Sequence, residues 1–274
     1  MNGPRIFLGT SWKMNKTVSE ALEFAQRLLE VLGNVSGLEE IQLFVIPPFT
    51  AIEAVKRASA GRFWVGAQNM HWAEWGAFTG EISAPMLQEL GVDLVELGHA
   101  ERREYFNETD EDVQRKVHTA LRYGLRPLVC IGEQSKDREF RVEKEAIARQ
   151  LKVALSGVPA ECAARLIVAY EPVWAIGEEG TTASPQDVRA MTAHIRGLLE
   201  KIFGAEAALV PVLYGGTVDE ENAAELLLEG RTDGLFVGRA AWTVEGFARI
   251  IASCATAINE QPSGEMHENR AYSS

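Results

Sequence analysis

Short apolar runs alternate with segments of helical periodicity along almost the whole chain. Most of these runs are apolar at consecutive positions and end in Gly, Pro or a polar residue, a pattern typical of strands buried on both faces. Eight runs predict strands, at residues 6–9, 43–46, 63–67, 94–97, 128–131, 166–170, 210–214 and 235–237. Pro211 fits this prediction only near the start of a strand, because proline lacks a donor N–H group.

Helical patterns fill the intervals between these runs. Thr17 and Glu20 have the spacing of a capping box, and apolar residues follow them on one helical face. Ser184 and Pro185 predict another helix start, since proline is favoured at the first helical position. Eight strands, each followed by a helix at about 30 residues per unit, predict an α/β protein with a single-domain (β/α)8 TIM barrel.

An open, doubly wound sheet is the alternative architecture. That fold carries a glycine-rich fingerprint after its first strand, and this sequence has none there. No linker divides the body of the chain. We therefore expect residues 1–260 to form one barrel domain, and residues 261–274, rich in Ser, Glu, Asn and Gly, to form a disordered C-terminal tail.

The charge balance limits the classes of partner. The chain has 274 residues, with 39 acidic against 27 basic side chains and a formal net charge of −12. Such a protein repels nucleic acid and anionic membrane, so we expect neither as a partner. A small anionic substrate remains possible, because backbone N–H groups and one lysine are enough to bind a phosphate.

Targeting signals and cysteines add two further expectations. The sequence has no uncharged apolar run long enough for a membrane span and no signal peptide, so we expect a cytoplasmic protein. Cys130, Cys162 and Cys254 are widely spaced in apolar surroundings. We expect them to be buried thiols that form neither a disulfide framework nor a metal site.

Polar residues cluster where the predicted strands end. In a (β/α)8 barrel, the carboxyl ends of all strands meet on one face, where the chemistry takes place. Read in order, these ends carry Ser11, Lys13, Gln68, Asn69, His99, Glu133, Glu171, Gly215, Gly216, Thr217, Gly238 and Arg239. One lysine, one histidine and two carboxylates therefore converge, which predicts a catalytic site.

The amino-acid sequence around these positions resembles that of the triosephosphate isomerase family. The resemblance runs from about residue 5 to residue 258 and rests on motifs at residues 12–15, 66–69, 76–83, 97–103, 130–133, 170–177 and 214–216. It implies an isomerase that moves the carbonyl of a small sugar phosphate through an enediolate, interconverting dihydroxyacetone phosphate and glyceraldehyde 3-phosphate. It also implies that the reaction needs no cofactor and no metal ion.

The resemblance assigns four catalytic residues. Glu171 is the base that takes a carbon-bound proton, and His99 is a neutral electrophile at a helix start. Lys13 offsets the charge that grows on the reacting oxygens, and Glu101 lies near both Lys13 and His99. The reaction itself requires a base, an electrophile and a phosphate anchor, so these roles agree with what the chemistry demands.

Three further features follow from the resemblance. Backbone N–H groups of Gly177, Thr217, Gly238 and Arg239 would bind the phosphate. A lid at residues 172–183 would close over it, with Pro172, Val173 and Trp174 as its hinge and Glu178, Glu179 and Gly180 in its tip. The loop at residues 72–82, with Thr79 at its tip, would reach into the site of a second subunit, which implies a homodimer.

Two departures from the family pattern bear on the substrate. Ser11 stands where the family usually has asparagine beside Lys13, and the lid is one residue longer and carries two carboxylates. These changes favour an alternative within the family, an isomerase of four-carbon ketose phosphates (erythrulose or tetrulose phosphates) from erythritol breakdown. A non-catalytic phosphate-binding barrel is a more distant alternative, because such a protein would be expected to have lost Lys13, His99 or Glu171.

Overall fold

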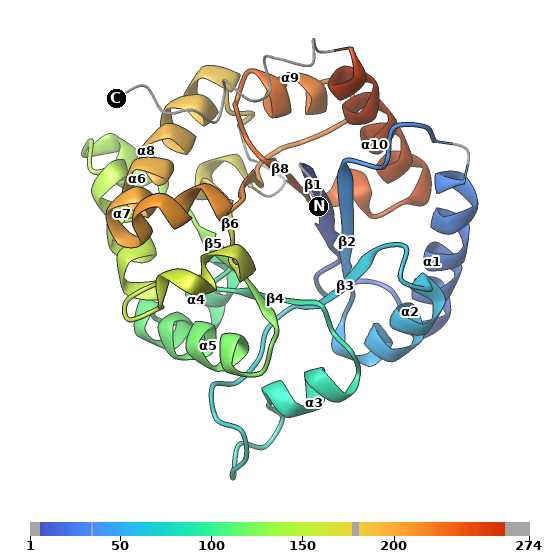
Figure 1. The fold of residues 1–274 in the computed structure, drawn as a ribbon, viewed down its shortest axis with the longest axis horizontal. Coiled ribbons are helices and arrows are strands. Elements are labelled where there is room, and N and C mark those ends of the chain that lie inside the picture. The colour runs from blue at the N-terminus through green and yellow to red at the C-terminus, as the bar shows by residue number, and fades with distance from the viewer. Residues whose placement is uncertain (1–5, 34, 177–180, 261–274) are drawn as a thin grey trace.

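The fold is a closed barrel of parallel strands surrounded by helices. The structure, a computed structural model, describes residues 6–33, 35–176 and 181–260. Its eight strands pair in sequence order from β1 to β8, and β8 closes the barrel against β1. Figure 1 shows the helices as a ring around these strands. The predicted (β/α)8 TIM barrel is therefore confirmed, and the open sheet is excluded.

The strands lie close to their predicted positions. Their bounds are β1 Ile6–Ser11, β2 Ile41–Ile46, β3 Trp64–Ala67, β4 Leu94–Leu97, β5 Arg126–Ile131, β6 Ile167–Tyr170, β7 Val212–Tyr214 and β8 Gly234–Val237. The first strand is longer than predicted, because Thr10 and Ser11 also pair with β2. The seventh is shorter and begins directly after Pro211.

The helices α1 and α8 begin where the sequence predicts them. The bounds of the helices are α1 Val18–Leu32, α2 Ile52–Ser59, α3 Ala84–Glu89, α4 Ala100–Phe106, α5 Asp110–Arg122, α6 Ser135–Glu139, α7 Glu143–Ala154, α8 Pro185–Phe203, α9 Ala223–Leu228 and α10 Val244–Asn259. Single 3-10 turns lie at η1 Phe49–Ala51, η2 Ala160–Arg165, η3 Val173–Ala175, η4 Gly204–Leu209 and η5 Arg239–Ala241. Thr17 and Glu20 form the predicted capping box of α1, and Ser184 caps α8.

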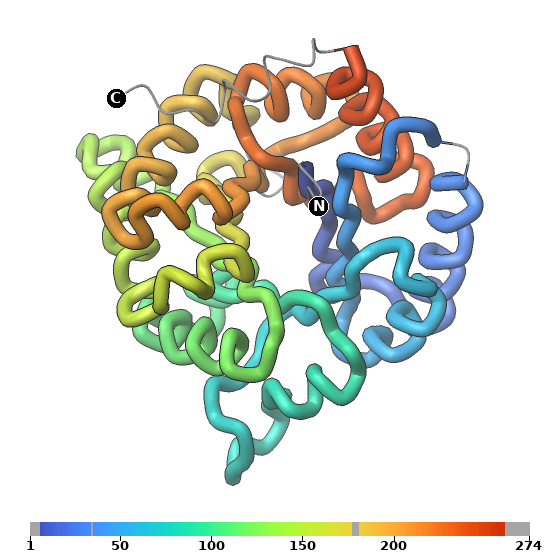
Figure 2. The backbone as a smooth tube through the Cα atoms, viewed as in Figure 1, coloured from blue at the N-terminus to red at the C-terminus, as the bar shows by residue number. Residues whose placement is uncertain are grey.

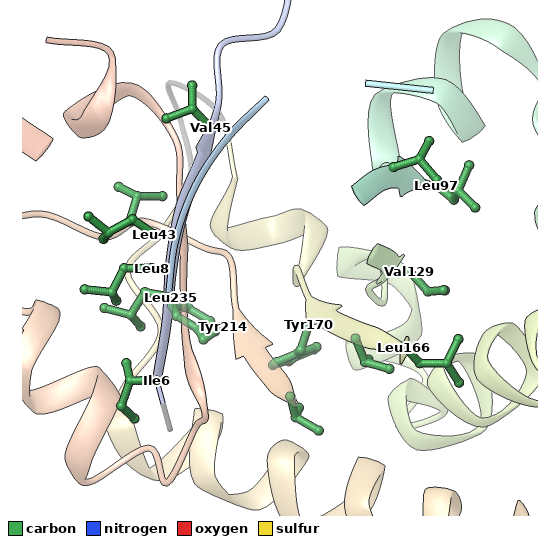
Figure 3. Packing of buried hydrophobic residues seen from close by; sticks show 14 of the residues in the cluster. Ile6, Leu8, Leu43, Val45, Leu97, Val129, Leu166, Tyr170, Tyr214 and Leu235 are labelled. Carbon is green, nitrogen blue, oxygen red and sulfur yellow. The ribbon is translucent and has the colours of Figure 1, made fainter. Parts of the chain in front are cut away.

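The strands bury apolar side chains on both faces. Outward-facing residues pack against the helices, and Figure 3 shows part of this layer, in which Leu8, Leu43 and Leu235 come from three neighbouring strands. Inward-facing residues fill the barrel with a second cluster: Phe7, Phe44, Ile46, Leu94, Leu128, Cys130, Ile167, Ala169, Leu213 and Phe236. This double burial explains why most of the strands are apolar at consecutive positions.

One loop departs from the compact ring. The segment between β3 and α3 projects outward from the helices, as the cyan part of the tube shows in Figure 2. His71 stacks on Trp72 near the base of this loop, with ring centroids 4.2 Å apart, and also contacts Phe78. Trp75, farther along the loop, is 72% exposed. A large aromatic side chain is thus presented to solvent on a projecting segment.

The expectation for the cysteines is confirmed for two of the three. Cys130 and Cys254 are buried, but Cys162 is partly exposed because it lies in the surface turn η2, where its Sγ accepts a hydrogen bond from Arg165 at 3.3 Å. All three are free thiols. Among the described residues, no helix has both the length and the apolar character that crossing a bilayer requires. The predicted tail, residues 261–274, lies outside the described part of the chain.

Candidate active site

The predicted titratable side chains meet at the carboxyl ends of β1, β4 and β6. Nε2 of His99 lies 3.6 Å from Oε2 of Glu171. Nζ of Lys13 lies 2.6 Å from Oε1 of Glu101, whose other oxygen lies 3.6 Å from Nδ1 of His99. The structure therefore brings together all four residues that the sequence predicts as catalytic.

Lys13 is held in an unusual backbone conformation. Its φ of 53° lies in the left-handed region, which non-glycine residues seldom adopt and which often marks a functional position. The side-chain amide of Gln68 donates to the Lys13 carbonyl oxygen at 2.8 Å, and Asn15 donates to the carbonyl of Trp12 at 2.9 Å. These bonds fix the turn that directs the ammonium group toward Glu101.

His99 caps the N-terminus of α4, and the residue before it, Gly98, adopts a backbone conformation that favours glycine. Gly98 has φ of 77°, and a Cβ there would lie only 3.0 Å from Val113 and 3.2 Å from the Cys130 carbonyl oxygen. Nδ1 of His99 accepts a hydrogen bond from the backbone N–H of Glu101 at 3.2 Å. Because Nδ1 is an acceptor, the ring proton is assigned to Nε2, on the side of Glu171.

The surroundings of His99 keep its ring neutral. Burial lowers its pKa to about 4, the charge of Lys13 acts in the same direction, and the Glu101 carboxylate opposes only part of this effect. A neutral imidazole retains its Nε2–H at physiological pH. The ring can therefore donate a hydrogen bond to an oxygen that becomes negatively charged.

Glu171 lies immediately after β6 in a close-packed corner. A Cβ on Gly132 would lie 1.8 Å from the Glu171 carbonyl oxygen, and one on Gly215 would lie 2.8 Å from its Cγ. Both neighbouring strands thus need glycine at the points where they meet this residue. The Glu171 side chain is buried, and its Oε2 has no hydrogen-bond partner among the described residues.

This environment raises the proton affinity of the Glu171 carboxyl group. Burial raises its pKa to about 8, and the charge of Glu96 adds to this effect. Lys13 and a hydrogen bond from the Cys130 thiol oppose it. A base whose pKa lies near the working pH is ionised in a large fraction of molecules and still binds a proton strongly. General-base catalysis requires both properties.

The start of the lid is anchored to neighbouring strand ends. Nε1 of Trp174 donates to Oε1 of Glu133 at 2.6 Å, and the Tyr170 hydroxyl donates to the same oxygen at 3.1 Å. The hydroxyl of Thr217 donates to the Ala175 carbonyl oxygen at 2.9 Å. The segment predicted as the hinge of the lid, Pro172, Val173 and Trp174, is therefore held at Trp174. The predicted lid tip, Glu178, Glu179 and Gly180, lies outside the described residues.

The predicted phosphate residues lie on adjacent strand ends. Thr217 follows β7, and Gly238 and Arg239 follow β8 at the start of η5. Gly177 lies outside the described residues. Ser11, at the end of β1, is buried beside this region and its carbonyl oxygen accepts a hydrogen bond from Trp242 at 3.0 Å. Thr79 lies on the projecting loop between β3 and α3, where it is exposed, away from these strand ends.

Sequence reasoning missed one buried acid in this site. Glu96 lies within β4, is 3% exposed, and has the Ser11 hydroxyl close by. Burial raises the pKa of Glu96 to about 7, while the Ser11 hydroxyl and the Lys13 charge oppose the rise. A glutamate in an otherwise apolar strand could have indicated this residue, because burying a charged side chain inside a barrel costs free energy. For Gln68, which donates to the Lys13 carbonyl oxygen, the sequence predicted only a polar residue at the end of a strand.

Within residues 6–33, 35–176 and 181–260, no group of three or more His, Cys, Asp or Glu side chains is arranged to hold a metal ion.

A buried base faces a neutral imidazole beside a lysine at the carboxyl end of a (β/α)8 barrel, an arrangement suited to proton transfer between adjacent carbons. A model of the triosephosphate isomerase family matches residues 6–254. The chain belongs to this family, as its motifs suggested, and is an isomerase of the aldose–ketose type.

Three similar proteins share the name of one branch of that family. The chain is 48% identical over 259 residues to a protein of Rhizobium rhizogenes named L-erythrulose-1-phosphate isomerase, covering 93% of this chain and 97% of that protein. Proteins with the same name from Mesorhizobium japonicum and Rhizobium meliloti are 49% and 46% identical, covering 92% and 94% of this chain and 98% and 100% of those proteins.

Proposed function

We propose that this enzyme isomerises a four-carbon ketose phosphate, L-erythrulose 1-phosphate, by moving its carbonyl from the second carbon to the third. The similarity to L-erythrulose-1-phosphate isomerases over nearly the full length of both chains carries this proposal. Ser11, a shorter side chain than the asparagine usual at this position, supports it. A four-carbon substrate is therefore favoured over the interconversion of dihydroxyacetone phosphate and glyceraldehyde 3-phosphate.

The reaction begins with proton removal from carbon. Ionised Glu171 takes the proton from C3, and the electron pair of that C–H bond forms a C2–C3 double bond. The C2 carbonyl oxygen becomes the enediolate oxygen and accepts a hydrogen bond from Nε2 of His99. Lys13 lowers the energy of this anion through its positive charge.

The second half of the reaction reverses these movements on the neighbouring carbon. The proton on the C3 hydroxyl passes to the oxygen on C2, with His99 Nε2 between the two oxygens, and a carbonyl forms at C3. Glu171 then returns its proton to C2. The product is a four-carbon ketose whose carbonyl lies one carbon farther from the phosphate. No atom is gained or lost.

The phosphate supplies binding energy away from the reacting carbons. Backbone N–H groups near Thr217, Gly238 and Arg239, with Gly177 of the lid, are the proposed phosphate ligands. Closure of the lid from the hinge at Pro172, Val173 and Trp174 would exclude water from the enediolate, which otherwise loses phosphate. The anchored Trp174 supports a lid that moves about a fixed base.

A homodimer is the proposed assembly. Trp75 on the projecting loop is exposed, and Met14, beside the catalytic Lys13, is 95% exposed. A loop of this kind from a second subunit, with Thr79 at its tip, would cover Met14 and so complete the surroundings of Lys13. Sedimentation velocity tests this point, and a monomer at micromolar concentration would contradict it.

Turnover by the purified protein tests the substrate. The assay compares L-erythrulose 1-phosphate, its D enantiomer and dihydroxyacetone phosphate under the same conditions. We expect the highest kcat/KM for L-erythrulose 1-phosphate. A kcat/KM for dihydroxyacetone phosphate near the diffusional ceiling of about 10⁸ M⁻¹s⁻¹ would instead make this a triosephosphate isomerase with a variant lid.

A further inference from the structure

Glu96 is a buried acid that the proton transfers described above do not use. Its neighbour Leu94 belongs to the cluster inside the barrel, and residues two apart in a strand face the same side, so Glu96 also faces the interior. Its Oε2 has no hydrogen-bond partner among the described residues. A buried carboxyl oxygen without a partner is costly, and such groups concentrate at functional sites.

Ser11 reaches the same point from the other side of the barrel. Its hydroxyl lies close enough to Glu96 to lower the pKa of that carboxyl group, although β1 and β4 are separated by two strands in the closed order. Both side chains are more than nine-tenths buried. The charge of Glu96 acts on Glu171 and on Cys130, so the Ser11–Glu96 pair lies just inside the site that holds the base.

The topology places Glu96 at the end of the site away from the phosphate, and Ser11, on β1 next to β8, lies on the phosphate side. The proposed phosphate ligands follow β7 and β8, and β4 stands four places from β8 in the closed barrel of eight strands, which is directly opposite. A substrate bound by its phosphate at β7 and β8 therefore extends toward β4. In this orientation its reacting carbons would lie between Glu171 and His99, with the last carbon on the side of Glu96.

We propose that Glu96, together with Ser11, binds the hydroxyl on the fourth carbon of the substrate and thereby sets the preference for a four-carbon chain. This inference rests on the proposed function. A hydroxyl both donates and accepts, so it pairs with Glu96 in the ionised or the protonated form. A three-carbon substrate leaves Oε2 of Glu96 without a partner, and a site built to bind a hydroxyl rejects the analogue that lacks it.

The test measures the ratio of kcat/KM for L-erythrulose 1-phosphate to that for dihydroxyacetone phosphate. Assays at about pH 9 keep Glu171 ionised in each variant, since its pKa is about 8. Glu96→Leu should lower the ratio at least about tenfold, mainly through the four-carbon substrate. Glu96→Gln retains a hydrogen-bonding group of the same shape and should restore most of the preference.

A matched control separates binding from packing. Leu128 pairs in register with Glu96 and lies in the same interior cluster. Leu128→Met changes the shape of the interior without changing its polarity, so it should leave the ratio within about threefold of wild type. Replacing a buried carboxyl by an apolar side chain is often tolerated. Should thermal unfolding show that Glu96→Leu does not fold, the unbranched Glu96→Met carries the same test.

The outcomes distinguish this inference from the proposed function. A wild-type protein that prefers dihydroxyacetone phosphate overturns the proposed function, whatever the Glu96 variants do. A wild-type protein that prefers L-erythrulose 1-phosphate, with an unchanged ratio in Glu96→Leu, overturns only the role of Glu96.

Discussion

The two halves of the barrel interior differ sharply in chemistry. One half is apolar and contains Phe7, Phe44, Leu94 and Phe236, with the rings of Phe44 and Phe236 centred 5.7 Å apart. The half nearer the carboxyl ends holds Ser11, Glu96, His99, Cys130 and Glu171. Both halves exclude water, but only the second uses that exclusion to shift pKa values.

This contrast separates stability from activity. Apolar side chains in the first half lower the free energy of the folded state through burial and close packing. Burial in the second half has the opposite effect, because it penalises charged groups and leaves oxygens of Glu96 and Glu171 without partners among the described residues. Substitutions in the two halves should therefore have different consequences, and four experiments examine this.

The largest effect is expected at the base. Glu171→Gln keeps the shape of the side chain but cannot accept the substrate proton, so kcat should fall about 10²- to 10⁴-fold. Thermal unfolding should show no loss of stability, since a buried acid becomes a neutral amide. Steady-state kinetics measure the fall, and Glu161→Gln on the surface is the matched control. Near-wild-type turnover by Glu171→Gln would remove this residue from the mechanism.

Truncating the apolar half should affect folding instead. Phe44 is fully buried, and its ring fills the space beside Gly9. Phe44→Ala should lower the free energy of unfolding by about 3–5 kcal/mol, measured by chemical denaturation. Phe140 is 70% exposed, so Phe140→Ala should change it by no more than about 0.5 kcal/mol. Equal effects of the two substitutions would contradict the contrast between buried and exposed rings.

A smaller effect is expected where the polar half meets the substrate. Ser11→Asn introduces a larger side chain beside the proposed position of the fourth carbon. The steric conflict should cost about 1–3 kcal/mol, which is roughly tenfold to over a hundredfold in kcat/KM for L-erythrulose 1-phosphate. The reaction of dihydroxyacetone phosphate should be spared or improved. Parallel kinetics on both substrates decide the point, and equal losses on both would contradict it.

The smallest effect concerns pH. Glu171 acts as a base only when ionised, and burial raises its pKa to about 8, so kcat/KM should rise with pH through about 8. Substrate phosphate titrates near pH 6 and is already a dianion there. Glu96→Gln removes a like charge, so the rise should move to lower pH. A profile that is flat from pH 6 to 9 would show that Glu171 is ionised throughout this range.

The amino-acid sequence by itself determined most of the architecture. Strands buried on both faces are mostly apolar at consecutive positions, so β4 was predicted with its correct bounds although Glu96 interrupts its apolar run. Side-chain caps act within a few residues, which made the starts of α1 and α8 predictable from Thr17 and Ser184. Local rules of this kind need no knowledge of distant neighbours. The family motifs then supplied Lys13, His99, Glu101 and Glu171.

Only the tertiary structure decided how distant residues act on one another. Closing the barrel brought Ser11 of β1 to Glu96 of β4, and it placed Glu96 where its charge acts on Glu171. It also lowered the pKa of His99 to about 4 and raised the pKa of Glu171 to about 8. These effects depend on burial and on separations across the barrel. Both are properties of the folded chain, so no local pattern in the sequence encodes them.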